Sequence, residues 1–314
     1  MESTKSNYTP IQCLGSYMEN QLFIKRDDLI PFSFGGNKAR KAMLFWEDIK
    51  EKDVDYIVTY GSSHSNHCRI IANLASSQKL KCIIISPREN EQETFNRKMM
   101  KLFKAEMISC SLNEVRHVIE NTLEDLRARG YKPYFIPGGG HGNIGTQAYV
   151  ACYEEIRNYE RENGIFFDYI FHASGTGTTQ AGLVSGQLLH NDCRKIVGIS
   201  IARRVPYGRD VVIASIEDYL AERKVNVSKP IIEENTVFID DYICGGYGIH
   251  NSNILNSIKI LLEQYGIYSD SIYTGKAFGG MGDYVRTNHI RKKNILFLHT
   301  GSSPLFFDDL KDWE

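Results

Sequence analysis

The chain has 314 residues, and its 37 Lys and Arg residues nearly balance 38 Asp and Glu residues, giving a formal net charge of -1. This balance provides no basic surface for nucleic acid, and the 42% hydrophobic and 24% charged fractions are ordinary for a globular protein. No apolar run approaches the roughly 20 residues that a membrane span needs. The N-terminus also lacks the basic-then-apolar pattern of a secretory signal. We therefore expect a cytoplasmic protein of one or two domains.

Neither the cysteines nor the histidines follow a metal-binding pattern. The seven cysteines are irregularly spaced and include no C-x-x-C, which favours free, mostly buried thiols over disulfides or a zinc site. His64 and His67 could share a helical face, but no third ligand has suitable spacing, so we expect no metal. Adjacent acids point to opposite faces of a strand, so three pairs make poor acid–base dyads: Asp27–Asp28, Asp240–Asp241 and Asp308–Asp309.

Short apolar runs alternate with longer amphipathic stretches along the whole chain. The runs predict strands, in chain order, at Leu22–Lys25, Tyr56–Tyr60, Cys82–Ile85, Tyr134–Ile136, Tyr169–His172, Ile196–Ile201 and Ile295–His299. The stretches predict helices at Asn37–Lys50, Ser65–Gln78, Glu91–Leu102, Leu112–Arg129, Gly145–Glu162, Thr179–Leu189 and Ile254–Tyr265. This alternation indicates an α/β protein with parallel sheet.

Four polar or glycine-rich loops directly follow predicted strands. They span residues 61–67, 137–143, 174–179 and 300–303. Ligands bind at the carboxyl ends of the strands in open α/β sheets, so these loops would build one site. The third loop, Ser174-Gly175-Thr176-Gly177-Thr178-Thr179, is the best anion cradle, because a helix follows its glycines and hydroxyls. It matches neither the P-loop nor G-x-G-x-x-G, and an ordinary strand-to-helix turn stays an alternative.

Lys38 follows Gly35-Gly36-Asn37 at the predicted start of a helix. The positive end of a helix is a poor place for a structural cation. A positive field and partial burial would lower its pKa, as a lysine that forms a Schiff base requires. The alternative is a solvated lysine in a basic stretch with Arg40 and Lys41.

Several segments together resemble the 1-aminocyclopropane-1-carboxylate (ACC) deaminase and D-cysteine desulfhydrase family. They are Lys25-Arg26-Asp27-Asp28-Leu29, Gly35 to Lys41, Ser65-Asn66-His67, Gly175 to Gly182, Tyr247-Gly248, Tyr273 to Ala277 and His299-Thr300-Gly301. They occur in the family's order and cover nearly the whole chain. The combination is specific, although no single segment is.

The resemblance implies a pyridoxal 5′-phosphate (PLP) enzyme of fold type II, the tryptophan synthase β-like fold. Two αβα domains would then flank a PLP cleft. The large domain would comprise residues 1–41 and 151–314, and the small domain residues 42–150. Such enzymes are usually homodimers that act on a small amino-acid substrate.

The resemblance also implies a role for each matching residue. Lys38 would form the Schiff base, Asn66 would bond the ring hydroxyl, and Thr300 would face the pyridine nitrogen. The phosphate loop would comprise Gly175, Thr176, Gly177, Thr178 and Thr179. Ser65 and His67 would bind the substrate carboxylate, with Ser65 also a candidate nucleophile or proton shuttle. Tyr247 and Tyr273 would face the substrate as catalytic residues.

Some positions depart from the family's pattern. ACC deaminases carry Glu after the second tyrosine and usually Gln after Ser-Asn, whereas this chain has Thr274 and His67. Both changes favour the D-cysteine desulfhydrase branch. His64 in place of a usual Gln, and Gly248-Ile249-His250-Asn251 in place of Gly-x-Pro-Asn, fit neither branch well.

We therefore expect a PLP-dependent lyase that catalyses β-elimination on D-cysteine or a related β-substituted amino acid, giving an α-keto acid and ammonia. The alternatives are ACC deamination, or β-replacement or racemisation in a specialised pathway. A phosphate-ligand binding module without chemistry is a more distant alternative. Lys38 and the hydroxyl-rich loops argue against it.

Overall fold

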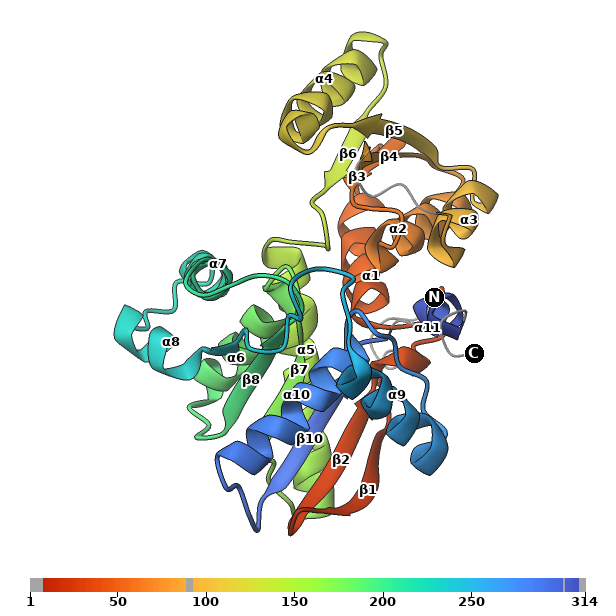
Figure 1. Cartoon of the computed structure of the whole chain (residues 1–314). Helices are drawn as coiled ribbons and strands as arrows, with labels where there is room; N and C mark the ends of the chain where they lie inside the picture. The colour runs from red at the N-terminus through yellow and green to blue at the C-terminus, as the bar shows by residue number, and fades with distance from the viewer. Residues whose placement is uncertain (1–7, 89–92, 302, 311–314) are drawn as a thin grey trace.

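The computed structural model describes residues 8–88, 93–301 and 303–310, which form two lobes around two separate sheets (Figure 1). The larger sheet has the order β1-β2-β10-β7-β8-β9. All its neighbours pair in parallel except β1 with β2. Its strands are β1 (Ile11–Tyr17), β2 (Asn20–Arg26), β7 (Tyr169–Ser174), β8 (Lys195–Ser200), β9 (Val237–Ile239) and β10 (Asn294–His299).

The smaller sheet is entirely parallel and has the order β5-β4-β3-β6. Its strands are β3 (Tyr56–Tyr60), β4 (Lys81–Pro87), β5 (Glu106–Cys110) and β6 (Pro133–Ile136). The helices of this part of the chain are α1 (Asn37–Ile49), α2 (Asn66–Ser77), α3 (Phe95–Leu102) and α4 (Val115–Ala128). One apolar cluster joins α1 and α2 to the sheet through Phe45, Ile57 and Ile71. A second cluster joins α4 to the opposite face through Val58 and Leu126.

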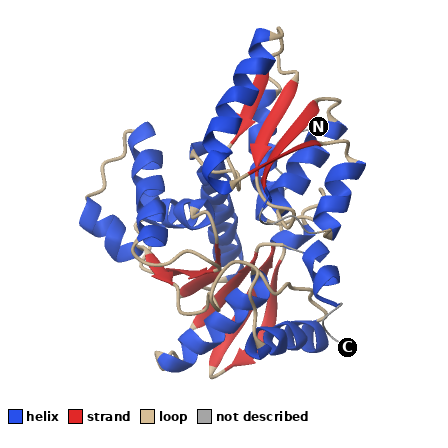
Figure 2. Cartoon of the chain, turned by 45° about the horizontal axis from the view of Figure 1, so that its top comes forward, coloured by secondary structure: helices blue, strands red, loops and turns tan. Residues whose placement is uncertain are grey.

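Helices cover both faces of the larger sheet (Figure 2). On one face, Tyr149, Val184 and Ile216 bring α5, α6 and α7 into a buried cluster with the sheet. On the other face, Leu261 and Met281 bring in α9 and α10. The helices are α5 (Asn143–Asn163), α6 (Thr178–His190), α7 (Tyr207–Glu222), α8 (Lys229–Asn235), α9 (Ser252–Tyr265), α10 (Thr274–Thr287) and α11 (Ser303–Asp309).

The structure confirms the α/β class and all seven strands and seven helices expected from the sequence, with shifted ends. The predicted helix Glu91–Leu102 begins only at Phe95, where the Thr94 side chain caps it; its positions 91 and 92 lie outside the described residues. The helix predicted from Leu112 begins as a 3-10 turn before α4. The elements without a prediction are β1, β5, β9, α7, α8, α10 and α11.

The proposed domain boundaries at residues 41/42 and 150/151 fall inside α1 and α5. The exact division of the chain therefore stays a proposal. All seven cysteines are free thiols. Among the described residues, no helix is long and apolar enough to cross a membrane. No cluster of three or more His, Cys, Asp or Glu side chains in that part of the chain could hold a metal ion.

The short helix α11 contacts α3 in the other lobe. The Asp308 carboxylate accepts a hydrogen bond from the Phe95 amide at 3.1 Å, at the start of α3. The phenyl rings of Phe307 and Phe95 also meet edge to face, 6.2 Å apart. The next residue, Asp309, accepts bonds from the amide and the hydroxyl of Ser271, each at 2.7 Å. The helix thus joins α3 to the loop that precedes α10.

A buried ionic network fixes the position of α1. Asp27, at the end of β2, accepts hydrogen bonds from Arg40 Nε and Nη2 at 3.0 and 2.7 Å, and from the Tyr149 hydroxyl at 2.7 Å. Glu155 on α5 pairs with Arg40 and with Lys25 of β2. Burial alone would raise the pKa of Asp27, but the Arg40 charge and hydrogen bond lower it to about 2. The carboxylate is therefore charged at neutral pH and holds α1 against β2 and α5.

Replacing Asp27 with Asn is expected to destabilise the protein by about 3–5 kcal/mol at pH 7, because it breaks the buried pair with Arg40 and leaves Arg40 and Lys25 to share the one carboxylate of Glu155. Since the pKa of Asp27 is about 2 when folded and 3.8 in the reference state, its ionic contribution is complete above about pH 4 and is lost as the pH falls toward 2. The difference from wild type should therefore shrink over that interval in urea unfolding experiments. Arg116→Gln, which removes an exposed pair with Glu120, should change nothing measurable. A difference that is equal at pH 7 and pH 3 would contradict this account.

Candidate active site

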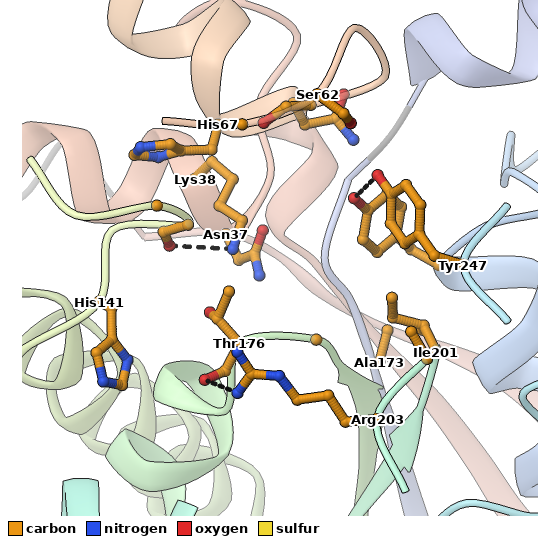
Figure 3. Close-up of a pocket in the computed structure, with 18 of the residues that line it drawn as sticks. Asn37, Lys38, Ser62, His67, His141, Ala173, Thr176, Ile201, Arg203 and Tyr247 are labelled. Atoms are coloured by element: carbon orange, nitrogen blue, oxygen red, sulfur yellow. Dashed lines mark hydrogen bonds between the residues drawn. The ribbon is translucent and has the colours of Figure 1, made fainter. Parts of the chain in front are cut away.

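A pocket of about 690 Å³ lies where the carboxyl ends of strands from both sheets meet. All four loops expected from the sequence contribute to its wall, together with the start of α1 and the segment after β8 (Figure 3). The lining residues include nine that the sequence singled out: Lys38, Ser65, Asn66, His67, Gly175, Thr176, Tyr247, Tyr273 and Thr300. Among the described residues of the wall, none carries a carboxylate, whereas Lys38 and Arg203 carry amine and guanidinium groups. The pocket is therefore suited to anionic ligands.

Two glycines bring Lys38 next to Thr300. Gly35 and Gly36 adopt positive φ angles of +64° and +93°. A Cβ on Gly35 would lie 2.3 Å from the Asp28 carbonyl oxygen, and one on Gly36 would lie 2.6 Å from the Thr300 carbonyl oxygen. That same Thr300 oxygen accepts a hydrogen bond from the Asn37 amide at 2.9 Å. Only glycine permits this close approach, so the pair sets where α1 begins.

The Lys38 amine lies on the pocket wall and donates a hydrogen bond to the Gly139 carbonyl oxygen at 3.1 Å. Burial, followed by the nearby charge of Arg203, lowers the pKa of Lys38 to about 8. Near physiological pH, Lys38 is therefore unprotonated in a larger fraction of the molecules than an ordinary lysine would be, and a nucleophile or base must be unprotonated. The expected depression of the pKa is present, but its two causes are burial and Arg203.

The predicted phosphate loop divides into two parts. Gly175 and Thr176 line the pocket, whereas Gly177, Thr178 and Thr179 are not in its wall. The Thr178 hydroxyl contacts the ring of His141 at 2.8 Å. The Thr179 hydroxyl accepts a hydrogen bond from the side-chain amide of Asn37 at 3.1 Å. These two hydroxyls therefore brace the loop, while the first turn of α6 leaves its backbone N–H groups for an anion.

Lys41 is buried beside the pocket, next to Gly140, although it does not line the wall and the sequence gave it no role. Its side chain is 1% exposed, and its Nζ has no hydrogen-bond partner among the described residues. Burial and the charge of Lys38 hold its pKa well below the usual value for lysine. Its stem packs beside Gly140, and Gly145 lies against both Gly140 and Thr178. A buried amine without a partner next to the start of α6 is suited to hold a phosphate. The three-residue spacing from Lys38, which places both on one face of α1, was the available signal.

Ser65 and His67 meet the pocket from the start of α2. The Ser65 hydroxyl oxygen caps the helix by accepting a bond from the Cys68 amide at 3.1 Å, which leaves its proton for another acceptor. The Thr59 hydroxyl donates to the Ile136 carbonyl oxygen at 2.8 Å, so it must accept from His67 Nε2, also at 2.8 Å. Burial and the charges of Lys38 and Lys41 hold the pKa of His67 far below the usual range. Its ring is thus neutral, with Nδ1 as an acceptor.

Tyr247 and Tyr273 form a pair whose hydroxyl oxygens lie 2.6 Å apart (Figure 3). Burial raises the pKa of both phenols, so both are protonated at neutral pH. Hydrogen bonds from Tyr273 and Ser62 favour ionisation of Tyr247, which makes it the more acidic member of the pair. The pair can therefore supply a proton through the Tyr247 hydroxyl.

The positions that depart from the ACC deaminase pattern differ in their relation to the pocket. Thr274 is fully buried at the start of α10, and its hydroxyl bonds the Asp270 carboxylate at 2.8 Å. His250 stands where the family has Pro, and its buried Nδ1 has no hydrogen-bond partner among the described residues; the matching Asn251 caps α9 by accepting a bond from the Ile254 amide. Thr274, His64 and His250 are not among the lining residues, whereas His67 is. Only the change at His67 therefore alters the wall itself.

The fold and the site together define an enzyme that holds an anionic cofactor beside a reactive amine. A model of a family described as pyridoxal-phosphate dependent enzymes matches residues 4–301, and the chain belongs to this family. It is 32% identical to a D-cysteine desulfhydrase of Serratia proteamaculans (94% of this chain, 90% of the relative). It is 33% identical to one of Yersinia enterocolitica (96% and 93%). A crystal structure of an ACC deaminase homologue superposes with a TM-score of 0.87 at 30% identity, over 97% of this chain and 92% of the other.

These comparisons confirm the fold type II architecture and the PLP cofactor expected from the sequence. The residues present fit that cofactor, because the pocket offers an amine, a neutral hydroxyl and a loop at a helix start. The buried amine of Lys41, which lacks a hydrogen-bond partner in the described part of the chain, fits the phosphate group of PLP as well.

Replacing Lys41 with Met should weaken PLP binding roughly 10- to 100-fold, because a charge-assisted hydrogen bond of about 1.5–3 kcal/mol is lost. Binding of pyridoxal, which lacks the phosphate, should change little. Both affinities can be measured by fluorescence titration of the cofactor-free protein. Lys50→Met, at the exposed end of α1, is the matched control. An equal loss for both ligands would place Lys41 outside the phosphate site.

Proposed function

We propose that this protein catalyses β-elimination on D-cysteine or a related β-substituted amino acid, releasing the β-substituent, a 2-oxo acid and ammonia. The observation that carries the proposal is the Lys38 amine, with its lowered pKa, in a pocket whose described wall has no carboxylate. The names of the relatives, D-cysteine desulfhydrase, support the same reaction.

Each part of the cofactor has a candidate partner in the chain. Asn66 would hold the ring hydroxyl, and Lys41 and the first turn of α6 would hold the phosphate. Thr300 would hold the ring nitrogen, since no described residue hydrogen-bonds its hydroxyl. When bound, PLP acts as an electron sink that stabilises negative charge at the α-carbon of an amino acid. A neutral hydroxyl at the ring nitrogen moderates this effect compared with a carboxylate.

The substrate carboxylate would be held at the start of α2. The Ser65 hydroxyl has a proton to donate, and the first turn of the helix offers backbone N–H groups that lack intrahelical partners. The ring of His67 presents an acceptor, so it suits a donor group of the substrate better than the carboxylate itself. This assignment modifies the role that the resemblance implied for His67.

Two side chains would move the protons. The neutral Lys38 amine takes the proton from the α-carbon, and the electron pair of that C–H bond drives out the β-thiolate. The Tyr247 hydroxyl, supported by Tyr273, gives its proton to the departing sulfur. The enamine product then reacts with water to give the 2-oxo acid and ammonia.

ACC lacks an α-hydrogen, so its ring opening needs a further group at the ring carbons. ACC deaminases carry a Glu where this chain has Thr274. Here that side chain is buried against Asp270 and is absent from the described wall. The site is therefore equipped for elimination and lacks one group typical of ring opening.

The wild-type enzyme should release sulfide and pyruvate from D-cysteine, with no more than trace 2-oxobutanoate from ACC. Lys38→Ala should retain PLP through the phosphate contacts and lose roughly 10²–10⁴-fold in turnover, the usual contribution of a general base. Keto-acid release by both proteins with both substrates is the assay, and Lys50→Ala should behave like wild type. Normal turnover by Lys38→Ala would refute the mechanism, and efficient turnover of ACC would favour ACC deamination.

We also propose that the enzyme is a cytoplasmic homodimer, as the resemblance implies. Seven free thiols suit a reducing compartment. Exposed apolar side chains gather on α3 and α11, where Phe95, Leu102 and Phe307 lie, and such patches often mark interfaces. Sedimentation velocity at micromolar concentration should give twice the mass of one chain. A single species of one chain's mass would refute the dimer.

A further inference from the structure

The orientation of the Asn66 carboxamide decides what the pocket offers at this position. An asparagine can present either its oxygen, which accepts, or its NH₂ group, which donates. The two ends are nearly identical in shape, so their placement depends on the surrounding hydrogen bonds. A deprotonated ring hydroxyl requires the donor. The inference below rests on the proposed contact between Asn66 and the cofactor.

The Asn66 oxygen faces two donors, Asn96 and Arg69, neither of which lines the pocket. Asn96 Nδ2 lies 3.0 Å from Asn66 Oδ1, and Arg69 Nη2 lies 3.4 Å from it. Asn96 could itself be turned over, but a second contact settles its orientation. Its oxygen accepts a bond from Arg69 Nε at 2.8 Å, and its nitrogen also donates to the His64 carbonyl oxygen at 2.9 Å.

Arg69 therefore dictates the direction of the whole chain of bonds. A guanidinium has donors only, so the atoms of Asn66 and Asn96 that face it must be oxygens. Arg69 is 0% exposed, and the groups around it are the Ser33 carbonyl and hydroxyl, the two asparagines and the ring of Phe34. None of these described partners is a carboxylate. Burial lowers its pKa to about 9, which still leaves it protonated at neutral pH.

We propose that Arg69, acting directly and through Asn96, is a positioning residue that fixes the Asn66 carboxamide with its NH₂ group toward the pocket. The site then offers a donor at this point and selects the deprotonated form of the cofactor's ring hydroxyl. The charge of Arg69, which no carboxylate of a described residue pairs with, favours the same anionic form. A buried guanidinium without a carboxylate is unfavourable for folding alone, which is consistent with a role at the site.

Asn96→Asp separates this role from a structural one. A carboxylate at position 96 would pair with Arg69 and would accept, where Asn96 donates to Asn66. The Asn66 carboxamide should turn over and present its oxygen to the pocket, because its 3.0 Å contact with position 96 is shorter than its 3.4 Å contact with Arg69 and so decides the orientation. If Arg69 were only structural, the new ion pair would leave the cofactor unaffected. Asn121→Asp, on the exposed face of α4, makes the same change of charge and is the control.

The measurements use the PLP-loaded enzyme and follow the visible absorbance of the bound cofactor. In Asn96→Asp, the pH midpoint of its colour change should move upward by about one unit, because an oxygen that loses its donor holds a proton more tightly. The dissociation constant for PLP should rise roughly tenfold. Asn121→Asp should match wild type in both. An Asn96→Asp enzyme with the wild-type midpoint and affinity would overturn the proposal.

Asn66→Asp tests the contact with the cofactor without changing Asn96, and its result is compared with that of folded Asn96→Asp. The carboxylate at position 66 would accept hydrogen bonds from both Arg69 and Asn96, so these two buried donors keep their partner. The pocket would lose the NH₂ group that Asn66 offers as a donor. The same upward shift in both variants supports the proposal. A shift in Asn66→Asp alone overturns the positioning role but leaves the Asn66 contact intact. A wild-type midpoint in both variants would overturn the Asn66 contact and the proposal with it. A wild-type protein without a visible band would instead refute the proposed function.

Discussion

The ionic network around Asp27 is the constraint on which the site depends. Asp27 and Arg40 lie on either side of the Gly35-Gly36 turn, so their pairing closes this segment of chain. The closed segment places the Asn37 amide on the Thr300 carbonyl oxygen, and Lys38 follows immediately. Because Glu155 and Tyr149 join the network from α5, the start of α1 is held by both β2 and α5. The amine that we propose as the base thus lies on a segment that is held from both β2 and α5.

The charged side chains around the pocket are mostly basic. Lys38, Lys41 and Arg203 lie near the cofactor loops, and Arg69 lies behind Asn66. The acids of the region are used elsewhere, with Asp27 and Glu155 below α1 and Asp270 at the start of α10. Unpaired buried cations reduce the stability of a folded chain unless an anion joins them. The binding of a phosphate and a carboxylate should therefore stabilise the folded protein as well as enable the reaction.

Much of this organisation could be predicted from the sequence, and the parts that could not have identifiable causes. The alternation of strands and helices gave the fold class, and the loops after four strands gave the location of the pocket. Helix α10 escaped prediction because its sequence, TGKAFGGMGDYVRT, carries four glycines, and burial rather than propensity supports it. Strand β1 escaped because it is an edge strand with a bulge between Cys13 and Gly15.

The site was predicted less completely, because hydrogen bonds between distant segments decide which way a side chain points. Thr178 and Thr179 were predicted as phosphate ligands; their hydroxyls contact His141 and Asn37 outside the pocket wall, so a role for them in phosphate binding stays a prediction. Lys41 looked like part of a solvated basic stretch, and only the fold shows that it is buried. The orientation of the Asn66 side chain depends on Asn96, 30 residues away in the sequence, and on Arg69, one helical turn after Asn66 in α2.

The short helix α11 contacts two segments that each lead to a different wall of the pocket. Through Asp308 it holds the start of α3, whose second residue, Asn96, contacts Asn66. Through Asp309 it holds Ser271, two residues before Tyr273. Helix α11 thus links the wall of the pocket that contains Asn66 to the wall that contains Tyr273. A rearrangement of this terminal helix would be transmitted to both walls at once, although none of its own residues enters the pocket.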